Sequence, residues 1–570
     1  MAKTFALVAA AASLIHSVTA QCTTAPNQTY DYIVIGSGAG GIPVADRLSE
    51  AGHSVLLLEK GPPSSGRWNG TMKPAWLEGT NLTRFDVPGL FNQIWRDSNG
   101  VACEDTGVMA GCVLGGGVAV NSALWWKPPT RDWDVNFPEG WKSADMKSSV
   151  DKVFQRIPGT DTPSQDGIRY NQEGFERISE GLDAAGFKQV KPNEQSEEKN
   201  MTYGHSTFFI ENAERQGPLR TYLETAAARS QFSLWTNTMA RRVVRTGGRA
   251  TGVELQCRNG AGFNGTVNVT PGTGRVIVSA GTMGSAKVLF RSGIGPTDML
   301  NVVKKSPIDN ETMISEDQWI NLPVGYNLND HVGTDIQVAH PDIRFYDFYK
   351  AYNTPIQTDV DAYLANRTGM LTTVAPNLGP IIWTEVTPSD GRTRSIQWQA
   401  RVEGRTNTSM TITQYLGTGS ISRGRLDITP QLNTRVVTVP YLRNATDKEA
   451  VIMGIEHMRG VLNGVANLTW VTPTAEQNTT TFVNSIPAAL ASRNSNHWVG
   501  SCTIGPANDG TAVVDLDTKV YGMDNLFVVD ASIFPGITTG NPSAAIVSVA
   551  EKAAARILAL KGTESEDGDV

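Results

Sequence analysis

The sequence predicts an α/β fold, α+β overall, in which a Rossmann-like domain is interleaved with a second domain built on an antiparallel β-sheet. Three observations predict it. A strand, a glycine-rich turn and a helix follow one another in residues 32–52, and a second strand with an Ala-Gly end opens a helix in residues 274–291. A last strand and helix close the chain in residues 525–560. Between these segments lie short β-rich runs typical of an antiparallel sheet, namely 394–402, 409–416 and 434–442.

The first segment reads "YDYIVIGSGAGGIPVADRLSEAGHSVLLLEKG" and carries a dinucleotide-binding motif. Gly36, Gly38 and Gly41 have G-x-G-x-x-G spacing between an apolar strand and an amphipathic helix. Gly36 permits the tight turn, Gly38 lets the backbone approach a pyrophosphate, and Gly41 packs the helix against the strand. Glu59 ends the next strand, where its carboxylate can accept hydrogen bonds from ribose hydroxyls. This stretch alone does not distinguish NAD from FAD.

The N-terminus has the pattern of a secretory signal peptide in residues 1–20. Lys3 is followed by the apolar run "FALVAAAASLI" and by small residues before a cleavage point. The run is shorter than the ~20 residues that cross a bilayer, so we expect a secreted protein with no membrane segment. Residues 21–29 are then a linker. The formal charge of -7, with no basic cluster, argues against nucleic acid as a partner.

Asn-x-Ser/Thr sequons also indicate an extracellular protein. One sequon is weak evidence, whereas twelve behind a signal peptide are strong. The predicted glycosylation sites are Asn27, Asn69, Asn81, Asn200, Asn264, Asn268, Asn310, Asn366, Asn407, Asn444, Asn467 and Asn478.

The chain has five cysteines and no Cys-x-x-Cys pair, so we expect no zinc or iron–sulfur site. In an oxidising compartment Cys103 and Cys112 could close a short loop. The alternative is that several cysteines are buried free thiols. The odd count leaves at least one thiol unpaired.

Three later stretches bear on the cofactor. In "MAGCVLGGGVAVNSALWW" (109–126), glycines would let the backbone lie against a bulky planar group that Asn121 could hydrogen-bond. The others are "GRVIVSAGTMGSAKVLFRSGIG" (274–295) and "NLPVGYNLNDHV" (321–332). Together with the first motif they resemble the glucose-methanol-choline (GMC) family of FAD oxidoreductases, over about residues 30–560. The resemblance implies bound FAD, and the residues expected beside it are Gly36, Gly38, Gly41, Glu59, Gly115, Gly116, Asn121, Ala280, Gly281, Asp530 and Asn541.

Within the family the chain is most similar to the flavin domain of fungal cellobiose dehydrogenases, through "FDVPGLFNQIW", "SGIGPTDM" and "NSNHWV". Val120 stands where some family members carry a histidine bonded to the flavin, so we expect FAD to be non-covalent. Those dehydrogenases have a haem domain before the flavin domain, and here only about ten residues separate the predicted cleavage point from the first strand. Electrons are therefore expected to pass to an external acceptor: a quinone, a radical, a redox protein or O₂.

The family resemblance places the catalytic pair on His497 and Asn541. Alcohol oxidation needs a base for the hydroxyl proton while a hydride leaves the carbon, and histidine suits this task because its pKa lies near working pH. A carboxamide can hold the hydroxyl in line. His331, in "NDHV", is expected to act near the cofactor loop rather than in proton transfer.

The change of pattern along the chain predicts the domains, and the resemblance and the residues beside His497 predict substrate contacts. Arg401 is similar to a sugar-contacting arginine, Ser495 and Asn496 are candidate hydrogen-bonders, and three tryptophans could stack on a pyranose: Trp125, Trp126 and Trp498. The FAD-binding domain is expected at 30–150, 226–325 and 496–560, the substrate-binding domain at 151–225 and 326–495, and a disordered acidic tail at 561–570.

We therefore expect a secreted FAD-dependent enzyme that oxidises a cellobiose-like saccharide to its lactone. The alternative is the same chemistry on a non-sugar alcohol, such as an aryl alcohol or a secondary metabolite. A non-catalytic binding protein is disfavoured by His497 and Asn541. An NAD-dependent dehydrogenase is disfavoured because one nucleotide fold leaves the later glycine motifs unexplained.

Overall fold

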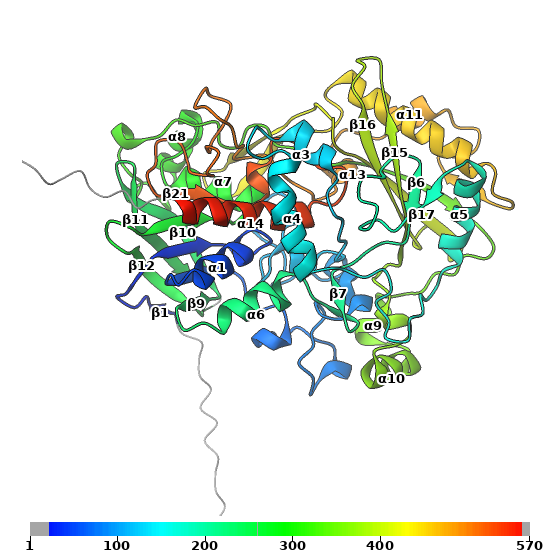
Figure 1. Ribbon diagram of the computed structural model, residues 1–570, viewed down its shortest axis with the longest axis horizontal. Helices are drawn as coiled ribbons and strands as arrows, with labels where there is room; N and C mark the ends of the chain where they lie inside the picture. Colours follow the sequence, from blue (N-terminus) through cyan, green and yellow to red (C-terminus); the bar gives the residue numbers. More distant parts are fainter. Residues whose placement is uncertain (1–21, 259, 561–570) are drawn as a thin grey trace, which may run out of the picture.

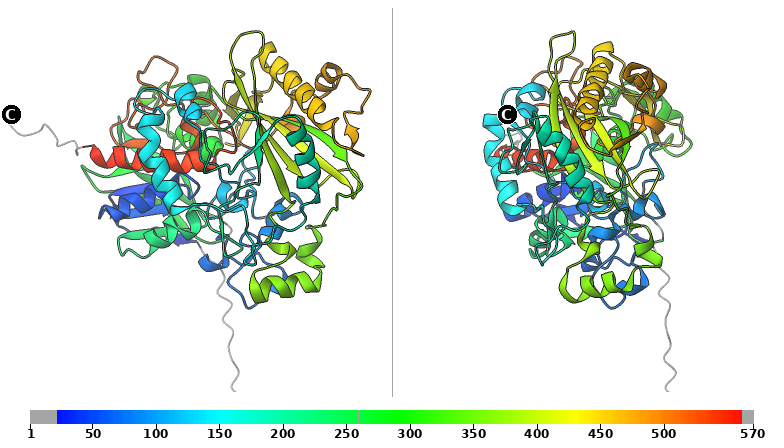
Figure 2. Two further views of the ribbon diagram at one scale, coloured as in Figure 1. Left: turned by 45° about the vertical axis from the view of Figure 1, so that its right-hand side comes forward. Right: turned by 90° about the vertical axis from the view of Figure 1, so that its right-hand side faces the viewer.

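The computed structural model describes residues 22–258 and 260–560; the predicted signal peptide and acidic tail lie outside them. The chain forms two sheet-based lobes side by side (Figure 1). One contains a five-stranded parallel sheet and the other a seven-stranded, mainly antiparallel sheet. The predicted α/β fold, α+β overall, is confirmed. Figure 2 shows that segments from both ends of the chain return to the parallel-sheet lobe.

The parallel sheet is built from short apolar runs that are buried on both faces, as is usual where helices and other layers cover a sheet. The first two strands match the predicted runs in "YIVI" and "SVLLLE". In spatial order the strands are β21 (Leu526–Val528), β13 (Arg275–Val278), β3 (Tyr32–Ile35), β4 (Val55–Leu58) and β9 (Phe232–Trp235).

Three helices follow these strands and begin at the same edge of the sheet. They are α1 (Gly41–Glu50), α7 (Gly281–Arg291) and α14 (Ser543–Ala559). Helix α1 ends where Gly52 adopts a φ of 93°, a left-handed conformation that glycine permits at a helix C-terminus. Because parallel strands share a direction, the three helix N-termini with their free N–H groups lie near one another.

A small β-meander accompanies the parallel sheet. It consists of β10 (Thr238–Thr246), β11 (Arg249–Cys257) and β12 (Phe263–Val269), and it packs against α7, β4 and β13. The N-terminal strands β1 (Thr23–Thr24) and β2 (Thr29–Tyr30) pair with β12. A disulfide between Cys22 and Cys257 closes this arrangement, a pairing that the sequence did not predict.

The seven-stranded sheet draws its strands from three separate parts of the chain. Helices α5 (Glu173–Ala184) and α11 (Ala445–Leu462) pack against it (Figure 1). Its order is β20 (Thr469–Thr472), β14 (Val332–Ala339), β17 (Ser409–Leu416), β16 (Arg394–Arg401), β15 (Leu378–Val386), β6 (Thr202–Gly204) and β5 (Lys188–Gln189).

One predicted strand lies elsewhere. The run at 434–442 forms β19 (Thr434–Thr438), which pairs with β18 (Arg425–Ile428) in a separate two-stranded ribbon. It alternates buried and exposed side chains, so it suits a ribbon on the surface better than a sheet interior. Pro440, which lacks a backbone donor, follows the strand closely.

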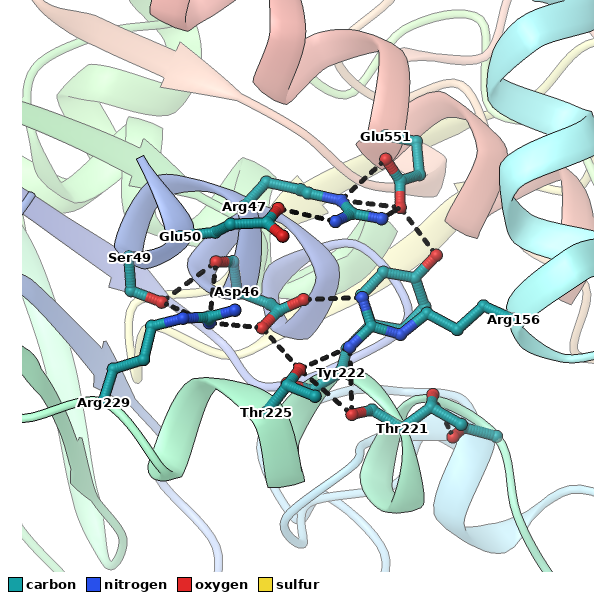
Figure 3. Close-up of polar contacts among 11 residues, drawn as sticks. Asp46, Arg47, Ser49, Glu50, Arg156, Thr221, Tyr222, Thr225, Arg229 and Glu551 are labelled. Carbon is teal, nitrogen blue, oxygen red and sulfur yellow. Dashed lines mark hydrogen bonds and ion pairs between the residues drawn. The ribbon is translucent and has the colours of Figure 1, made fainter. Parts of the chain in front are cut away.

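Buried ion pairs hold α1 against its neighbours (Figure 3). Asp46, on α1, is fully buried and accepts hydrogen bonds from Arg156 (2.8 Å) and Arg229 (2.6 Å). Arg156 ends helix α4 (Ser143–Arg156). Arg47 pairs with Glu551 of α14 at 2.7 Å. The two helices whose N-termini face the same edge of the sheet are thereby fixed to each other and to α4.

We expect Asp46→Ala to lower the free energy of unfolding by about 3 kcal/mol or more, because two largely buried guanidinium groups lose their partner. Urea unfolding monitored by circular dichroism measures it. Asp151→Ala is the matched control, since Asp151 on α4 pairs with Lys147 at an exposed position and should change stability by at most about 1 kcal/mol. Equal losses in the two variants would contradict the role of the buried pairs.

Candidate active site

A cavity of about 950 Å³ lies between the two sheets. From the parallel sheet its wall includes Gly36, Glu59 and Asp530, each directly or closely after the carboxyl end of a strand. From the antiparallel sheet its wall includes Gln399 and Arg401. Ligands of open α/β sheets bind outside the carboxyl ends of the strands, so this position identifies the cavity as the candidate site.

The glycines of the first motif make one end of the cavity narrow enough for backbone contact. Gly36 has a φ of 102°, and a Cβ there would lie 2.4 Å from the carbonyl oxygen of Ser279. A Cβ on Gly41 would lie 1.9 Å from the carbonyl oxygen of Gly36. At Gly38 a Cβ would meet nothing within 4 Å, which leaves open space beside the start of α1. The backbone there can approach a pyrophosphate group closely.

Gly115 and Gly116 bring a second glycine turn against the first. Gly115 and Gly116 have φ values of 96° and 51°, and a Cβ on Gly116 would lie 3.3 Å from the Cα of Gly38. This turn leads into a single helical turn, α2 (Gly117–Val120). Glycine is needed here because a side chain would separate the two turns.

Glu59 lies at the wall of the cavity with its carboxylate already oriented. Its Oε2 accepts from the hydroxyl of Ser37 (2.5 Å), and its Oε1 accepts from the backbone N–H of Gly61 (2.8 Å). Burial raises the pKa of Glu59. A carboxylate that accepts these bonds retains lone pairs for ribose hydroxyls, as the motif predicts.

Asp530 caps the N-terminus of α7. Its Oδ2 accepts from the backbone N–H of Gly281 (2.8 Å) and from the hydroxyl of Ser285 (2.5 Å), while Ala280 is the residue before the helix. Asp530, Ala280 and Gly281 all line the cavity, as predicted for cofactor-binding residues. Burial raises the pKa of Asp530.

Asn121 links the glycine turn to α14. Its Nδ2 donates to the Ser543 hydroxyl (3.1 Å), and its Oδ1 accepts from Arg215 (3.1 Å). It lies in the wall of the cavity together with Val120. The predicted contact of Asn121 with a planar group remains compatible with this position.

His497 and Asn541, 44 residues apart in the chain, meet in the cavity wall. The Nδ2 of Asn541 lies 2.9 Å from the Nε2 of His497. The Oδ1 of Asn541 accepts from the indole N–H of Trp126 (2.9 Å) and from the amide of Gln397 (2.8 Å). Because indole nitrogen only donates, these bonds assign Oδ1 and Nδ2 of Asn541, and Nδ2 must donate to His497.

The Nε2 of His497 therefore carries a lone pair, which accepts this hydrogen bond from Asn541 at the cavity wall. Burial, and secondly the neighbouring His331, hold the pKa of His497 well below its ordinary value. A neutral imidazole with an unprotonated Nε2 can act as a general base for a substrate hydroxyl placed between it and Asn541. The sequence placed His331 near the cofactor loop, whereas the structure places its Nδ1 3.1 Å from the Nδ1 of His497.

A disulfide-closed loop forms another part of the cavity wall. Cys103 and Cys112 form a disulfide, so the alternative that both are free thiols is wrong. Cys502 is a buried free thiol. Asp105 in this loop accepts from Lys60 (2.8 Å) and Lys287 (2.6 Å), and these bonds and charges hold the pKa of Asp105 well below its usual range despite burial.

Arg401 lies on the antiparallel sheet with its guanidinium group held in place. It donates to Thr413 (2.7 Å) and to Asp335 (3.1 Å), and all three side chains line the cavity. Beside it, the Oε1 of Gln399 is buried and has no hydrogen-bond partner among the described residues. Such an orphaned acceptor in a cavity wall is suited to a ligand hydroxyl.

Ser495 and Asn496 line the cavity next to His497. The Ser495 hydroxyl lies 2.5 Å from Asp330, so its proton is engaged within the protein. Asn496 has a φ of 59° and hydrogen-bonds Asn494. Their contacts with a substrate stay a prediction.

The predicted tryptophan platform is wrong for Trp125. Its side chain is fully buried, packs against Phe154 and Phe209, and donates to the Ile157 carbonyl, so no ligand can reach it. Trp126 instead supports Asn541. A tryptophan at the cavity wall that the sequence analysis missed is Trp95, which is 60% exposed. Apolar exposure of this size is visible only once the fold is known.

The fold and the site are those of an oxidoreductase. Comparison with known proteins identifies the family of the chain. Residues 30–333 and 420–550 match the two family models for GMC oxidoreductase. The chain therefore belongs to the GMC oxidoreductase family, as the motifs predicted. It is an FAD-dependent oxidoreductase that acts on CH–OH groups.

Similar proteins match this chain along almost their whole length. An oxygen-dependent choline dehydrogenase from Rhizobium johnstonii is 26% identical over 559 residues, covering 93% of this chain and 95% of that protein. A Chaetomium thermophilum FAD-dependent oxidoreductase superimposes with a TM-score of 0.72 at 18% identity, covering 93% and 99% of the two chains. A fungal aryl-alcohol oxidase gives a TM-score of 0.68 at 19% identity, covering 94% and 99%.

The residues of the cavity fit FAD. The close glycine turns and the start of α1 suit the pyrophosphate, and Glu59 suits the ribose. The N-terminus of α14, at Asn541 and Ser543, faces the cavity and favours negative charge, such as that of a reduced flavin. Within residues 22–258 and 260–560, no helix combines the length and apolar character that a membrane crossing requires.

We expect His497→Ala to slow flavin reduction by an alcohol substrate at least about 100-fold, because the general base is removed. Stopped-flow absorbance of the flavin measures this, and the spectrum before mixing shows that FAD is retained. His457→Ala, on α11 outside the cavity wall, is the control and should react normally. An unchanged rate in His497→Ala would remove this residue from the reaction.

We also expect the rate of flavin reduction to stay constant as the pH falls through 6.5, the ordinary pKa of histidine. The neutral form of His497 is the active one, and its lowered pKa keeps it neutral in more acidic solution. The measurement is the limiting rate of flavin reduction between pH 5 and 8. A decline centred at pH 6.5 or above would contradict the burial of this base.

Proposed function

We propose that the protein is a secreted FAD-dependent dehydrogenase that oxidises the anomeric hydroxyl of a cellobiose-like saccharide to a lactone. Bound FAD supplies the hydride acceptor, the flavin N5. His497 takes the hydroxyl proton at Nε2, while Nδ2 of Asn541 donates to the same oxygen and keeps it in line. Val120 offers no atom for a covalent link, so FAD is held by non-covalent contacts alone.

The observation that supports a saccharide as the substrate is the polar wall of the cavity opposite the glycine turns. Gln399, Arg401 and Thr413 present amide, guanidinium and hydroxyl groups there, and Asn496 adds an amide beside His497. Exposed Trp95 adds an aromatic surface. A pyranose presents hydroxyl edges and an apolar face, and a wall with both kinds of group is complementary to it. The resemblance of "FDVPGLFNQIW", "SGIGPTDM" and "NSNHWV" to fungal cellobiose dehydrogenases also supports this proposal.

The charges of this wall favour a neutral substrate. Arg401 is held by Asp335 at 3.1 Å and lies 3.9 Å from Glu403. The guanidinium group is thus neutralised within the protein, so a carboxylate or phosphate on the substrate gains no free cation from it. A neutral saccharide needs no free cation in order to bind.

Secretion is supported by the surface and by the cysteines. Eleven of the twelve sequon asparagines are exposed. The exception is Asn444, which is half-buried and caps α11 by accepting from the backbone N–H of Thr446. Two disulfides, Cys22–Cys257 and Cys103–Cys112, suit an oxidising compartment. In that compartment the electrons pass to an external acceptor: a quinone, a radical, a redox protein or O₂.

A second candidate is a non-sugar alcohol, and the apolar part of the wall favours it. Phe91, Met109, Phe482 and Ile486 also line the cavity. They would suit an aromatic or otherwise apolar alcohol. A structurally similar protein is named as an aryl-alcohol oxidase.

Stopped-flow flavin reduction across cellobiose, lactose, glucose, benzyl alcohol and choline decides between these candidates. We expect the largest ratio of reduction rate to dissociation constant for a disaccharide. Reduction by benzyl alcohol with no reduction by any sugar would establish the second candidate. A product assay for the lactone confirms the position that is oxidised.

We expect Gln399→Met to raise the KM for the disaccharide about tenfold, because a hydrogen bond to a substrate hydroxyl of about 1.4 kcal/mol is lost. Steady-state kinetics measures this, and kcat should change little. The control is an alcohol substrate without sugar hydroxyls, which should keep its KM in the variant. An unchanged KM for the disaccharide would show that Gln399 does not bind the sugar.

A further inference from the structure

Two consecutive residues, Asp330 and His331, contact the proposed base from two sides. They immediately precede β14, which begins at Val332, and both are buried. Their segment runs beside the one that carries His497, since the backbones of Asn329 and Val499 pair. The sequence motif "NDHV" identified this dipeptide without showing what it touches.

The partners of His331 determine which of its nitrogens carries a proton. Its Nε2 lies 2.8 Å from the carbonyl oxygen of Thr538, which can only accept, so Nε2 donates. Burial lowers the pKa of His331 to about 4, so the ring is neutral and its Nδ1 is an acceptor. The Nδ1 of His497, 3.1 Å away, must then donate to it. His497 is thereby held as the Nδ1–H tautomer.

The same tautomer follows from the opposite side of the ring. Asn541 donates to Nε2 of His497, which is possible only if Nε2 carries no proton. Thr538 at one end of the hydrogen-bond chain only accepts, and Trp126 at the other end only donates. The direction of every bond between them is therefore fixed. A reversed His497 tautomer would leave two donors facing each other at Asn541 and two acceptors facing each other at His331.

Asp330 holds the backbone of the same turn. Its Oδ1 accepts from the backbone N–H of His497 (2.8 Å) and the hydroxyl of Ser495 (2.5 Å). Its Oδ2 accepts from the backbone N–H of Ser495 (3.0 Å) and the hydroxyl of Tyr441 (2.8 Å). With four donors on one carboxylate, the turn has little freedom to move the imidazole.

We propose that Asp330 and His331 are positioning residues for the base: Asp330 fixes the backbone of the Ser495–His497 turn, and the Nδ1 of His331 fixes the tautomer in which Nε2 of His497 carries no proton and can accept one. The inference rests on the proposed role of His497. When Nε2 takes the hydroxyl proton, the O–H bond of the substrate breaks and an N–H bond forms. The existing Nδ1–H of His497 continues to donate to His331.

Two substitutions of His331, by residues of nearly equal size, test whether its Nδ1 must accept the hydrogen bond from His497. In His331→Asn the amide oxygen can replace Nδ1 as an acceptor, whereas in His331→Leu nothing can. We expect flavin reduction to fall about 10- to 100-fold in His331→Leu and to stay within about threefold of the wild type in His331→Asn. The dissociation constant of the alcohol should change little in both, since neither change removes a substrate contact. Equal rates in the two variants would overturn the proposal.

A second measurement does not depend on activity. Histidine labelled with ¹⁵N in both ring nitrogens distinguishes the tautomers of each ring by NMR, and His497→Asn identifies the signals of His497. In the wild type we expect His497 as Nδ1–H and His331 as Nε2–H. In His331→Leu the His497 signals should shift towards a mixture of tautomers. An Nε2–H signal for His497 in the wild type would overturn the proposal even if a variant fails to fold.

The two readouts separate this inference from the proposed function. If no sugar reduces the flavin but another alcohol does, the substrate assignment fails, and the variants are compared with that alcohol. If no alcohol reduces the flavin, the role of His497 fails, while the NMR result still decides the tautomer. For Asp330, we expect Asp330→Asn to lower the rate of flavin reduction with FAD still bound, and an unchanged rate would exclude it as a positioning residue.

Discussion

The site depends on one hydrogen bond, from Nδ2 of Asn541 to Nε2 of His497 at 2.9 Å. The bond joins two segments that belong to different loops, and its direction decides whether the imidazole can act as a base. His497 and Asn541 alone do not determine which of them donates. The direction follows from Trp126, which only donates, and from Thr538, whose carbonyl only accepts, at the two ends of the chain of bonds. Burial then keeps both imidazoles neutral.

Buried carboxylates hold the two segments that meet there. Asp330 accepts four hydrogen bonds and fixes the turn before His497. Asp132 accepts from Thr418 (2.6 Å) and from the backbone N–H of Thr539 (2.8 Å), close to Asn541. Burial raises the pKa of both carboxyl groups to about 6. Asp46 likewise accepts hydrogen bonds from two arginines and holds helix α1 in place at the cofactor-binding end of the cavity. A buried charge is tolerated in each case because several donors converge on it.

Much of the cofactor end was predictable because its signals are local. The strand–glycine–helix pattern of 32–52 placed β3 and α1, and the apolar run that ends at Glu59 placed β4. The glycines are needed where backbone segments approach closely, as at Gly36 and Gly116. His497 and Asn541 were identified through the family resemblance. Ranges for the two domains and contacts for Arg401, Ser495 and Asn496 stay predictions.

What could not be predicted lies in contacts between distant segments. The sequence alone determined the parallel-sheet domain and its dinucleotide motif, because periodicity and glycine spacing act over a few residues. The family and FAD followed from the resemblance of four motifs taken together. Only the tertiary structure decided that His331 faces His497, that Trp125 is core whereas Trp95 is exposed, and that Cys22 bonds Cys257. It also placed 434–438 in a separate ribbon. Each of these depends on which surfaces pack together, and a local sequence pattern does not show that.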